Sequence, residues 1–189
     1  MKAEIIAIGN ELLSGAVQDT NSTFVSKILT DRGVEVAWRS TAGDAFAAIA
    51  EALRLAATRA DVVICTGGLG PTVDDVTIDA AAETFGLGLE TQPEVESKIR
   101  DFYKMLGVPC GDNALRQART LVGSQVLANY VGTAPGVFVK HGKSMFLFFP
   151  GVPRELHKML EPALDKALGE TGMKYVSRSL KVSGIGESQ

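Results

Sequence analysis

Four acidic side chains follow short apolar runs of the sequence and could share one site: Glu11, Asp44, Asp74 and Asp75. Carboxylate oxygens suit a hard cation such as Mg²⁺, which also bridges substrate phosphates. We therefore expect a divalent metal, Mg²⁺ or another divalent ion, to be bound by Asp44, Asp74 and Asp75. Asp is also a good helix N-cap, so helix capping by Asp44 and Asp74 is the alternative explanation.

A glycine-rich loop, Thr66-Gly67-Gly68-Leu69-Gly70-Pro71, offers a place for a phosphate. Successive glycines let neighbouring backbone N–H groups turn toward one point, which makes an anion-binding nest beside a helix end. The loop is neither a Walker loop nor a GxGxxG fingerprint, and a tight strand-to-helix connection without a ligand is the alternative. We expect all of Thr66, Gly67, Gly68, Leu69, Gly70 and Pro71 to bind substrate.

Two further loops rich in Gly and Pro, Val131–Gly136 and Pro150–Glu155, are expected to form the second wall of a pocket. Glu155, near the start of a helix, or Glu11 could orient an attacking water, although the helix dipole alone would favour an acid at Glu155. The expected catalytic residues are therefore Asp44, Asp74, Glu155 and Glu11. The other expected substrate-binding residues are Asn10, Ser14, Asn21, Gly132, Thr133, Pro150 and Gly151.

These loops must be positioned by alternating strands and helices. Short apolar runs predict strands at 4–8, 34–39, 61–65, 126–128, 136–139 and 145–149. Apolar residues at helical spacing predict helices over 22–33, 44–57, 74–85, 95–106 and 153–168. Asn21, Asp44 and Asp74 are the expected starts of the first three helices. The alternation predicts an α/β fold with a mainly parallel sheet covered by helices on both faces.

The composition fits one soluble domain with a real core. Of 189 residues, 46% are hydrophobic and 22% are charged. Nineteen basic against twenty-two acidic residues give a net charge of −3, and no basic run is long enough to follow a nucleic-acid backbone. Apolar runs such as 145–149 are far shorter than the roughly 20 residues of a membrane span. We expect no nucleic acid or membrane partner, no signal peptide and a cytoplasmic location, with Cys65 and Cys110 as reduced structural thiols.

Several motifs in fixed order closely resemble the CinA family, named for competence/damage-inducible protein A, whose wider relatives are the molybdopterin-binding MoaB, MogA and MoeA domains. The motifs are Gly9–Gly15 with Asp19–Asn21, Thr66–Thr77, Val131–Gly136 and Pro150–Glu155. The resemblance covers roughly the first 170 residues. Departures from the family pattern are modest: Asn10 stands where Thr is frequent, Ala42 where Val is usual, and Val73 where Pro is usual.

The resemblance implies a three-layer α/β/α sandwich with a mixed sheet, as in molybdopterin-binding domains, over residues 1–170. Residues 171–189 look like the start of a following region that is cut short, so we expect no C-terminal deamidase domain in this chain. The implied ligand is a nucleotide or pterin phosphate, and the implied activity is metal-dependent hydrolysis of the ADP-ribose pyrophosphate. The alternatives are molybdopterin binding with adenylyl transfer from ATP, or a non-catalytic ligand-binding module. Because related domains form oligomers, we also expect a homo-oligomer.

Overall fold

A six-stranded mixed sheet forms the centre of the molecule. The computed structural model describes residues 1–169, so the expected start of a following region at 171–189 lies outside the described residues. The sheet order is β2-β1-β3-β8-β7-β6. Its parallel part consists of β1 (Lys2–Ile8), β2 (Glu35–Ala42), β3 (Val62–Thr66) and β8 (Ser144–Phe149). Strand β7 (Gly136–His141) is antiparallel to β8, and β6 (Gln125–Leu127) is antiparallel to β7.

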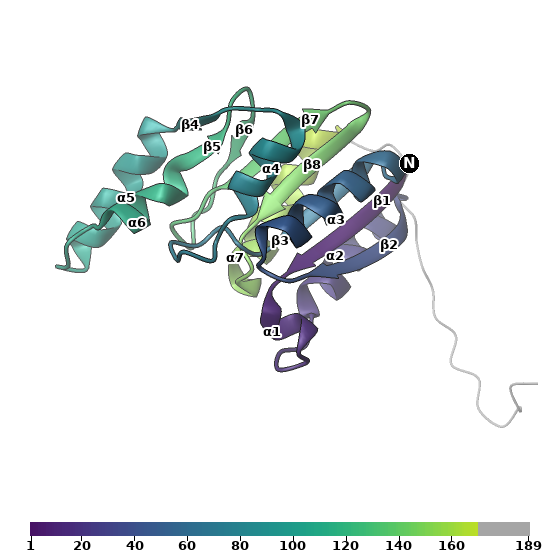
Figure 1. Ribbon diagram of the computed structural model, residues 1–189, viewed down its shortest axis with the longest axis horizontal. Helices are drawn as coiled ribbons and strands as arrows, with labels where there is room; N and C mark the ends of the chain where they lie inside the picture. Colours follow the sequence, from purple (N-terminus) through teal and green to yellow (C-terminus); the bar gives the residue numbers. More distant parts are fainter. Residues whose placement is uncertain (170–189) are drawn as a thin grey trace, which may run out of the picture.

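Helices cover both faces of this sheet, which confirms the predicted three-layer α/β/α fold (Figure 1). On one face, α2 (Thr20–Asp31) and α7 (Pro153–Leu168) pack on a core that includes Ile5, Ile64 and Leu147. On the other face, α3 (Phe46–Arg59) and α4 (Thr77–Phe85) pack on a core that includes Ile6, Cys65 and Phe148. Neighbouring residues of one strand belong to opposite cores because side chains alternate along a strand. This explains why the central strand β3 is apolar from Val62 to Cys65 without interruption.

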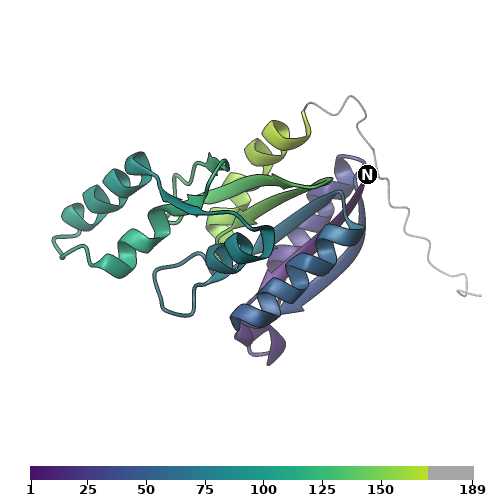
Figure 2. The ribbon, with the colours of Figure 1, turned by 45° about the horizontal axis from the view of Figure 1, so that its top comes forward.

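A smaller part of the chain projects from the sheet as an arm, which Figures 1 and 2 show at one side of the body. It contains β4 (Leu89–Thr91), α5 (Pro93–Met105), α6 (Asp112–Leu115), the short 3₁₀ helix η1 (Arg116–Ala118) and β5 (Arg119–Leu121). Strands β4 and β5 form a separate antiparallel pair. The arm has its own small core of Val95, Ile99, Ala114 and Ala118. Of these elements, the sequence predicted only α5.

Three predicted helix starts are wrong. Helix α2 begins at Thr20 and is capped by Asp19, whose side chain accepts from the Ser22 amide at 2.8 Å. Helix α3 has Ala45, not Asp44, at its N-cap, and α4 begins only at Thr77. The carboxylates of Asp44 and Asp75 accept hydrogen bonds from other loop residues, so they are not free to cap these helices. Asp44, Asp74 and Asp75 therefore lie in loops at one end of the sheet.

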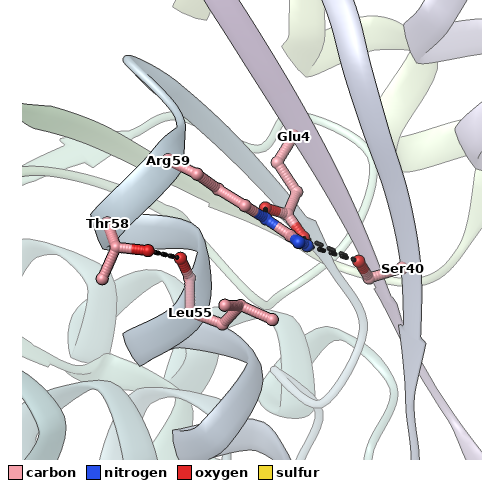
Figure 3. A network of polar contacts seen from close by, with 5 residues as sticks. All are labelled: Glu4, Ser40, Leu55, Thr58 and Arg59. Carbon is pink, nitrogen blue, oxygen red and sulfur yellow. Dashed lines mark hydrogen bonds and ion pairs between the residues drawn. The ribbon is translucent and has the colours of Figure 1, made fainter.

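A buried ion pair between Glu4 and Arg59 lies on the face of the sheet that α3 covers (Figure 3). Glu4 on β1 is 1% exposed and accepts from Arg59 at 2.6 and 2.8 Å. Ser40 on β2 donates to the same carboxylate at 2.6 Å. The hydrogen bonds from Arg59 to Glu4 raise the pKa of the guanidinium further above its already high value. The pair ties β1, β2 and the last turn of α3 together.

Within residues 1–169, no helix is long and apolar enough to cross a membrane.

Candidate functional site

A cleft of about 550 Å³ lies at the carboxyl ends of the parallel strands. This is where an open α/β sheet normally binds its ligand, because the loops that leave the strands converge there. Five acidic residues line it: Glu11, Asp44, Asp74, Asp75 and Glu155. The other predicted site residues along it are Gly67, Gly68, Leu69, Gly70, Pro71, Thr133, Pro150 and Gly151. The cleft thus gathers residues from all three groups of loops that the sequence singled out.

The glycine loop after β3 forms one side of the cleft and leaves backbone donors free. Gly67 and Gly68 have φ angles of 110° and 67°, a region that favours glycine. Thr77, at the start of α4, donates its hydroxyl to the Gly67 carbonyl at 3.0 Å and fixes the loop on the helix. Within residues 1–169, the amides of Gly68, Leu69 and Gly70 donate to no protein atom. Unpartnered consecutive amides of this kind are what an anion-binding nest requires.

Asp44 lies in the loop after β2, and the loop after β1 holds it at the cleft. Asn10 donates its backbone amide to Asp44 Oδ2 at 2.9 Å, and the Asp44 amide donates to Asn10 Oδ1 at 3.2 Å. Gly43 is needed for this approach, because a Cβ there would lie 2.6 Å from Asn10 Oδ1. The Asp44 carboxylate therefore accepts from the first amide of the short helix α1 (Asn10–Leu13) and also lines the cleft.

The other two aspartates differ from each other in their contacts. Asp75 Oδ2 accepts from the Thr72 amide at 2.8 Å and from the Thr72 hydroxyl at 2.6 Å, so this carboxylate closes a local turn. The Asp74 side chain is exposed and, within the described residues, makes no hydrogen bond. Of the three predicted metal ligands, Asp74 is thus the one with no structural partner.

The second wall of the cleft is built around Glu155, in the first turn of α7. Its Oε2 accepts from Asn129 Nδ2 at 2.6 Å, and the same nitrogen donates to the Ala134 carbonyl at 2.8 Å. A Cβ on Gly132 would meet the Glu155 carboxylate, so the loop backbone packs directly against it. Thr133 and Ala134 of this loop line the cleft beside Glu155.

The charged side chains that line the cleft are all acidic. Among the described residues that line it, there is no Lys, Arg or His against the five carboxylates. Residues 1–169 also contain no group of three or more His, Cys, Asp or Glu side chains arranged to hold a metal ion. The oxygen donors suit a hard cation, but the protein alone does not assemble a closed site for one.

Five predicted site residues lie outside the cleft lining: Asn10, Ser14, Asn21, Thr66 and Gly132. The Ser14 hydroxyl donates to the Glu11 carbonyl at 3.1 Å, and Asn10 is engaged with Asp44. Asn21 donates to the Gly151 carbonyl at 2.8 Å and thereby ties α2 to the loop before α7. Asn10, Ser14 and Asn21 thus make structural contacts in the loops of the site, and substrate contact by these five residues stays a prediction.

Two residues of the site were missed in the sequence. Gln117 lines the cleft from η1 and is 8% exposed, and its Oε1 has no partner within the described residues. Asn129 holds Glu155 and the loop after β6. Asn129 directly follows the predicted strand at 126–128, but its residue type alone gave no reason to assign it a role, and Gln117 lies where no strand or helix was predicted. A buried carboxamide without a partner is a signal that only coordinates reveal.

Cys65 lies at the end of β3, just before the glycine loop, and could be mistaken for a nucleophile. It is fully buried, and burial, followed by the nearby Glu4 charge, raises the pKa of its thiol far above the usual range. A protonated thiol is a poor nucleophile. The thiol therefore serves packing in the core under α3 and α4.

A second hollow of about 780 Å³ adjoins the cleft, and Thr133 lines both. It runs between α5 and the segment after β6, and its lining includes Ile99, Phe102, Val126 and Tyr130. Tyr130 is 90% exposed. The segment from Asn129 to Thr133 thus lines the apolar groove, and its last residue, Thr133, also reaches the polar cleft.

Comparison with known proteins shows which family this chain belongs to. A family model described as "Probable molybdopterin binding domain" matches residues 4–170. A competence-damage inducible protein of Bacillus velezensis is 41% identical over 192 residues, which covers all of this chain and 46% of that protein. The chain therefore spans about half the length of the curated relatives it matches.

Solved structures agree with this. The protein CinA from Thermoplasma acidophilum has a TM-score of 0.81 at 32% identity, over 88% of this chain and 97% of that one. The molybdopterin biosynthesis enzyme MoaB from Thermus thermophilus has a TM-score of 0.54 at 22% identity, over 89% of this chain and 97% of that one, and shares the fold. The chain shares its fold with MoaB and MogA. It belongs to the molybdopterin-binding domain family and, as its motifs indicated, to the CinA branch of that family.

Proposed function

We propose that the cleft binds a phosphorylated small molecule of the pterin or nucleotide class, with a phosphate on the amides of Gly68, Leu69 and Gly70. The observation that carries this proposal is the run of three amides without a protein partner beside the cleft. Hydrogen bonds from three N–H groups of one loop to an anion are charge-assisted, and they are therefore stronger than the bonds that these groups would make to water. The family description, which names molybdopterin, supports a phosphorylated pterin as the first candidate.

We further propose that a divalent cation such as Mg²⁺ accompanies the ligand. A phosphate that enters a cleft with five carboxylates and no basic side chain would be repelled unless a cation offsets the charge. Mg²⁺ is commonly bound through one or two carboxylates together with substrate phosphates, which fits a site that the protein does not close by itself. The residues that would hold it are Asp44, Asp74 and Asp75. When bound, such an ion supplies charge neutralisation at the phosphates.

The same cleft favours a second candidate, hydrolysis of a diphosphate such as ADP-ribose. The observation in its favour is that Glu155 and Glu11 line the cleft together with the glycine loop, so a carboxylate is available to accept a proton from water. If the ligand is a phosphorylated pterin, the reaction expected at this site is adenylyl transfer from ATP to that pterin. A binding module without turnover would use the same contacts with the ligand. The chemistry of the products separates these alternatives.

Calorimetry with three probes tests the proposal: molybdopterin, AMP and ADP-ribose, each with and without Mg²⁺. We expect at least one probe to bind, and Mg²⁺ to raise its affinity at least about tenfold, or about 1.4 kcal/mol. Formation of AMP and ribose 5-phosphate from ADP-ribose and water would support hydrolysis. Release of pyrophosphate from ATP with molybdopterin would support adenylyl transfer. Failure of every probe to bind, with Mg²⁺ present, would contradict the proposal.

A further inference from the structure

The carboxamide of Asn129 joins two parts of the cleft that are distant in the sequence. Its Oδ1 accepts from the amides of Val131 at 2.9 Å and Gly132 at 3.0 Å. Its Nδ2 donates to the Ala134 carbonyl at 2.8 Å and to Glu155 Oε2 at 2.6 Å. One side chain therefore closes the loop after β6 and fastens that loop to the first turn of α7.

The residue type is specified by these four contacts. Asp could accept from the two amides, but it could not donate to Glu155 or to Ala134. Lys could donate, but it could not accept from the amides. Gly132 is equally constrained, because a Cβ there would meet the Glu155 carboxylate. The loop is thus built to bring a neutral hydrogen-bond donor up to this carboxylate.

The bond to Asn129 also determines which atom of Glu155 remains available. Oε2 is engaged, whereas within residues 1–169 Oε1 accepts no hydrogen bond from the protein. A helix dipole favours an acid in the first turn of a helix but does not select one oxygen or one rotamer. A short hydrogen bond from a fixed loop does both.

We propose that Asn129 is a positioning residue that holds Glu155 so that Oε1 is the atom that meets a ligand in the cleft. This role rests on the proposed function, because it requires that the cleft binds a phosphorylated ligand. Thr133 and Ala134 line the cleft from the same loop as Asn129. The hydrogen bonds of Asn129 therefore also set the distance between these two residues and Glu155. A carboxylate with one fixed and one free oxygen is arranged to orient a hydroxyl or water of the ligand.

This role can be tested with variants that exchange the hydrogen-bond donor at position 129 and the acceptor at position 155. Asn129→Asp keeps the acceptor for Val131 and Gly132 but places two carboxylates against each other. Glu155→Gln keeps an acceptor for Asn129 but removes the charge. The double variant restores the hydrogen bond in the opposite direction, since Gln can donate to Asp. Asn113→Asp, on the exposed surface of α6, is the matched control for the first change.

Thermal denaturation without ligand reports the hydrogen bond itself. We expect Asn129→Asp to lower Tm by roughly 3–8 °C. The double variant should recover the part of this loss that comes from the contact with residue 155, since Asp still cannot donate to the Ala134 carbonyl. Glu155→Gln and Asn113→Asp should stay within about 2 °C of the wild type. An unchanged Tm for Asn129→Asp would overturn the proposed contact.

Calorimetry with the probe that the wild type binds, among molybdopterin, AMP and ADP-ribose with Mg²⁺, reports the positioning. Asn129→Asp should lose at least about tenfold in affinity at a temperature where it is folded. The double variant should regain this part of the stability but not affinity, because the Glu155 carboxylate is still missing. Recovery of both would make Glu155 a loop anchor and overturn the positioning role. A wild type that binds no probe contradicts the proposed function, and the positioning role with it, whereas normal affinity of Asn129→Asp contradicts the positioning role alone.

Discussion

Asn10 and Asp44 exchange two hydrogen bonds between the ends of neighbouring parallel strands, at 2.9 and 3.2 Å. Each residue supplies its backbone amide and accepts with its side chain. The exchange fixes the loop after β1 against the loop after β2 and holds a carboxylate at the cleft. Asp44 therefore has a structural contact and a position suited to a cation at the same time.

Asp44→Asn separates these two properties. Asn keeps an oxygen that accepts from the Asn10 amide, so we expect Tm to stay within about 2 °C of the wild type. It removes one negative charge, so the affinity for a phosphorylated probe in Mg²⁺ should fall at least about tenfold. Asp44→Ala should also lower Tm, by roughly 2–4 °C, because the acceptor is lost. Wild-type affinity for the probe in Asp44→Asn would show that Asp44 acts only through its contact with Asn10.

Asp74→Asn should change binding without changing stability, because this exposed side chain has no hydrogen-bond partner in the described residues. With Mg²⁺, we expect weaker binding of AMP or ADP-ribose, since a ligand of the cation is lost. Without Mg²⁺, we expect equal or slightly tighter binding, since one repulsive charge is removed. Calorimetry under both conditions checks this reversal of sign. Weaker binding in the absence of Mg²⁺ would indicate that Asp74 contacts the ligand directly.

Gly70→Ala tests the glycine loop with less damage than changes at its neighbours. A Cβ at Gly67 would meet the Ile8 carbonyl and one at Gly68 the Thr77 hydroxyl, and both glycines have positive φ. A Cβ at Gly70 would meet the Asp75 carboxylate at 2.6 Å, the movable end of a side chain. We expect Gly70→Ala to remain folded and to lose at least about fivefold in phosphate-probe affinity by calorimetry.

Gly111→Ala is the control for this change. Gly111 has a φ of −81°, and a Cβ there would meet nothing within 4 Å. Its affinity for the probe should therefore equal that of the wild type. Equal affinities for both variants would remove the Gly70 region from the phosphate site.

Much of this fold could be predicted from the sequence because its strands are short, β-branched and buried on both faces, as in Val62–Cys65. The loops of the cleft could be predicted because they follow the carboxyl ends of these strands. The predicted starts of α3 and α4 were wrong because Asp44 accepts from the Asn10 amide and Asp75 from the Thr72 amide, neither of which belongs to the helix that follows. The arm strands β4 and β5 span three residues each, too few for a periodic signal.

The partners of Asn129 explain why the remaining part of the site was not predicted. Its bond to Glu155 joins residues 26 positions apart, and no local pattern encodes such a contact. Gln117 likewise lies in the arm, where only α5 was predicted. The metal, the homo-oligomer and the boundary at residue 170 stay predictions.

The buried pair of Glu4 and Arg59 leads to a prediction about stability rather than binding. Glu4 is 1% exposed, whereas the Arg59 side chain is 27% exposed and packs over Trp38 with its guanidinium carbon 4.9 Å from the ring centroid. Loss of one partner is most costly when the remaining charge cannot reach water. Arg59→Met, which strands Glu4 with Ser40 as its remaining side-chain donor, should therefore cost more than Glu4→Gln, which leaves Arg59 near solvent.

Urea denaturation measures this asymmetry. We expect Arg59→Met to lower the free energy of unfolding by about 3 kcal/mol and Glu4→Gln by about 1–2 kcal/mol. Arg100→Met is the control, because Arg100 forms an exposed i,i+4 pair with Glu96 on α5, and an exposed pair of this kind contributes little to stability. An Arg59→Met variant as stable as the control would mean that Glu4 is satisfied without Arg59. A larger loss in Glu4→Gln than in Arg59→Met would mean that the guanidinium, and not the carboxylate, depends on the pair for its burial.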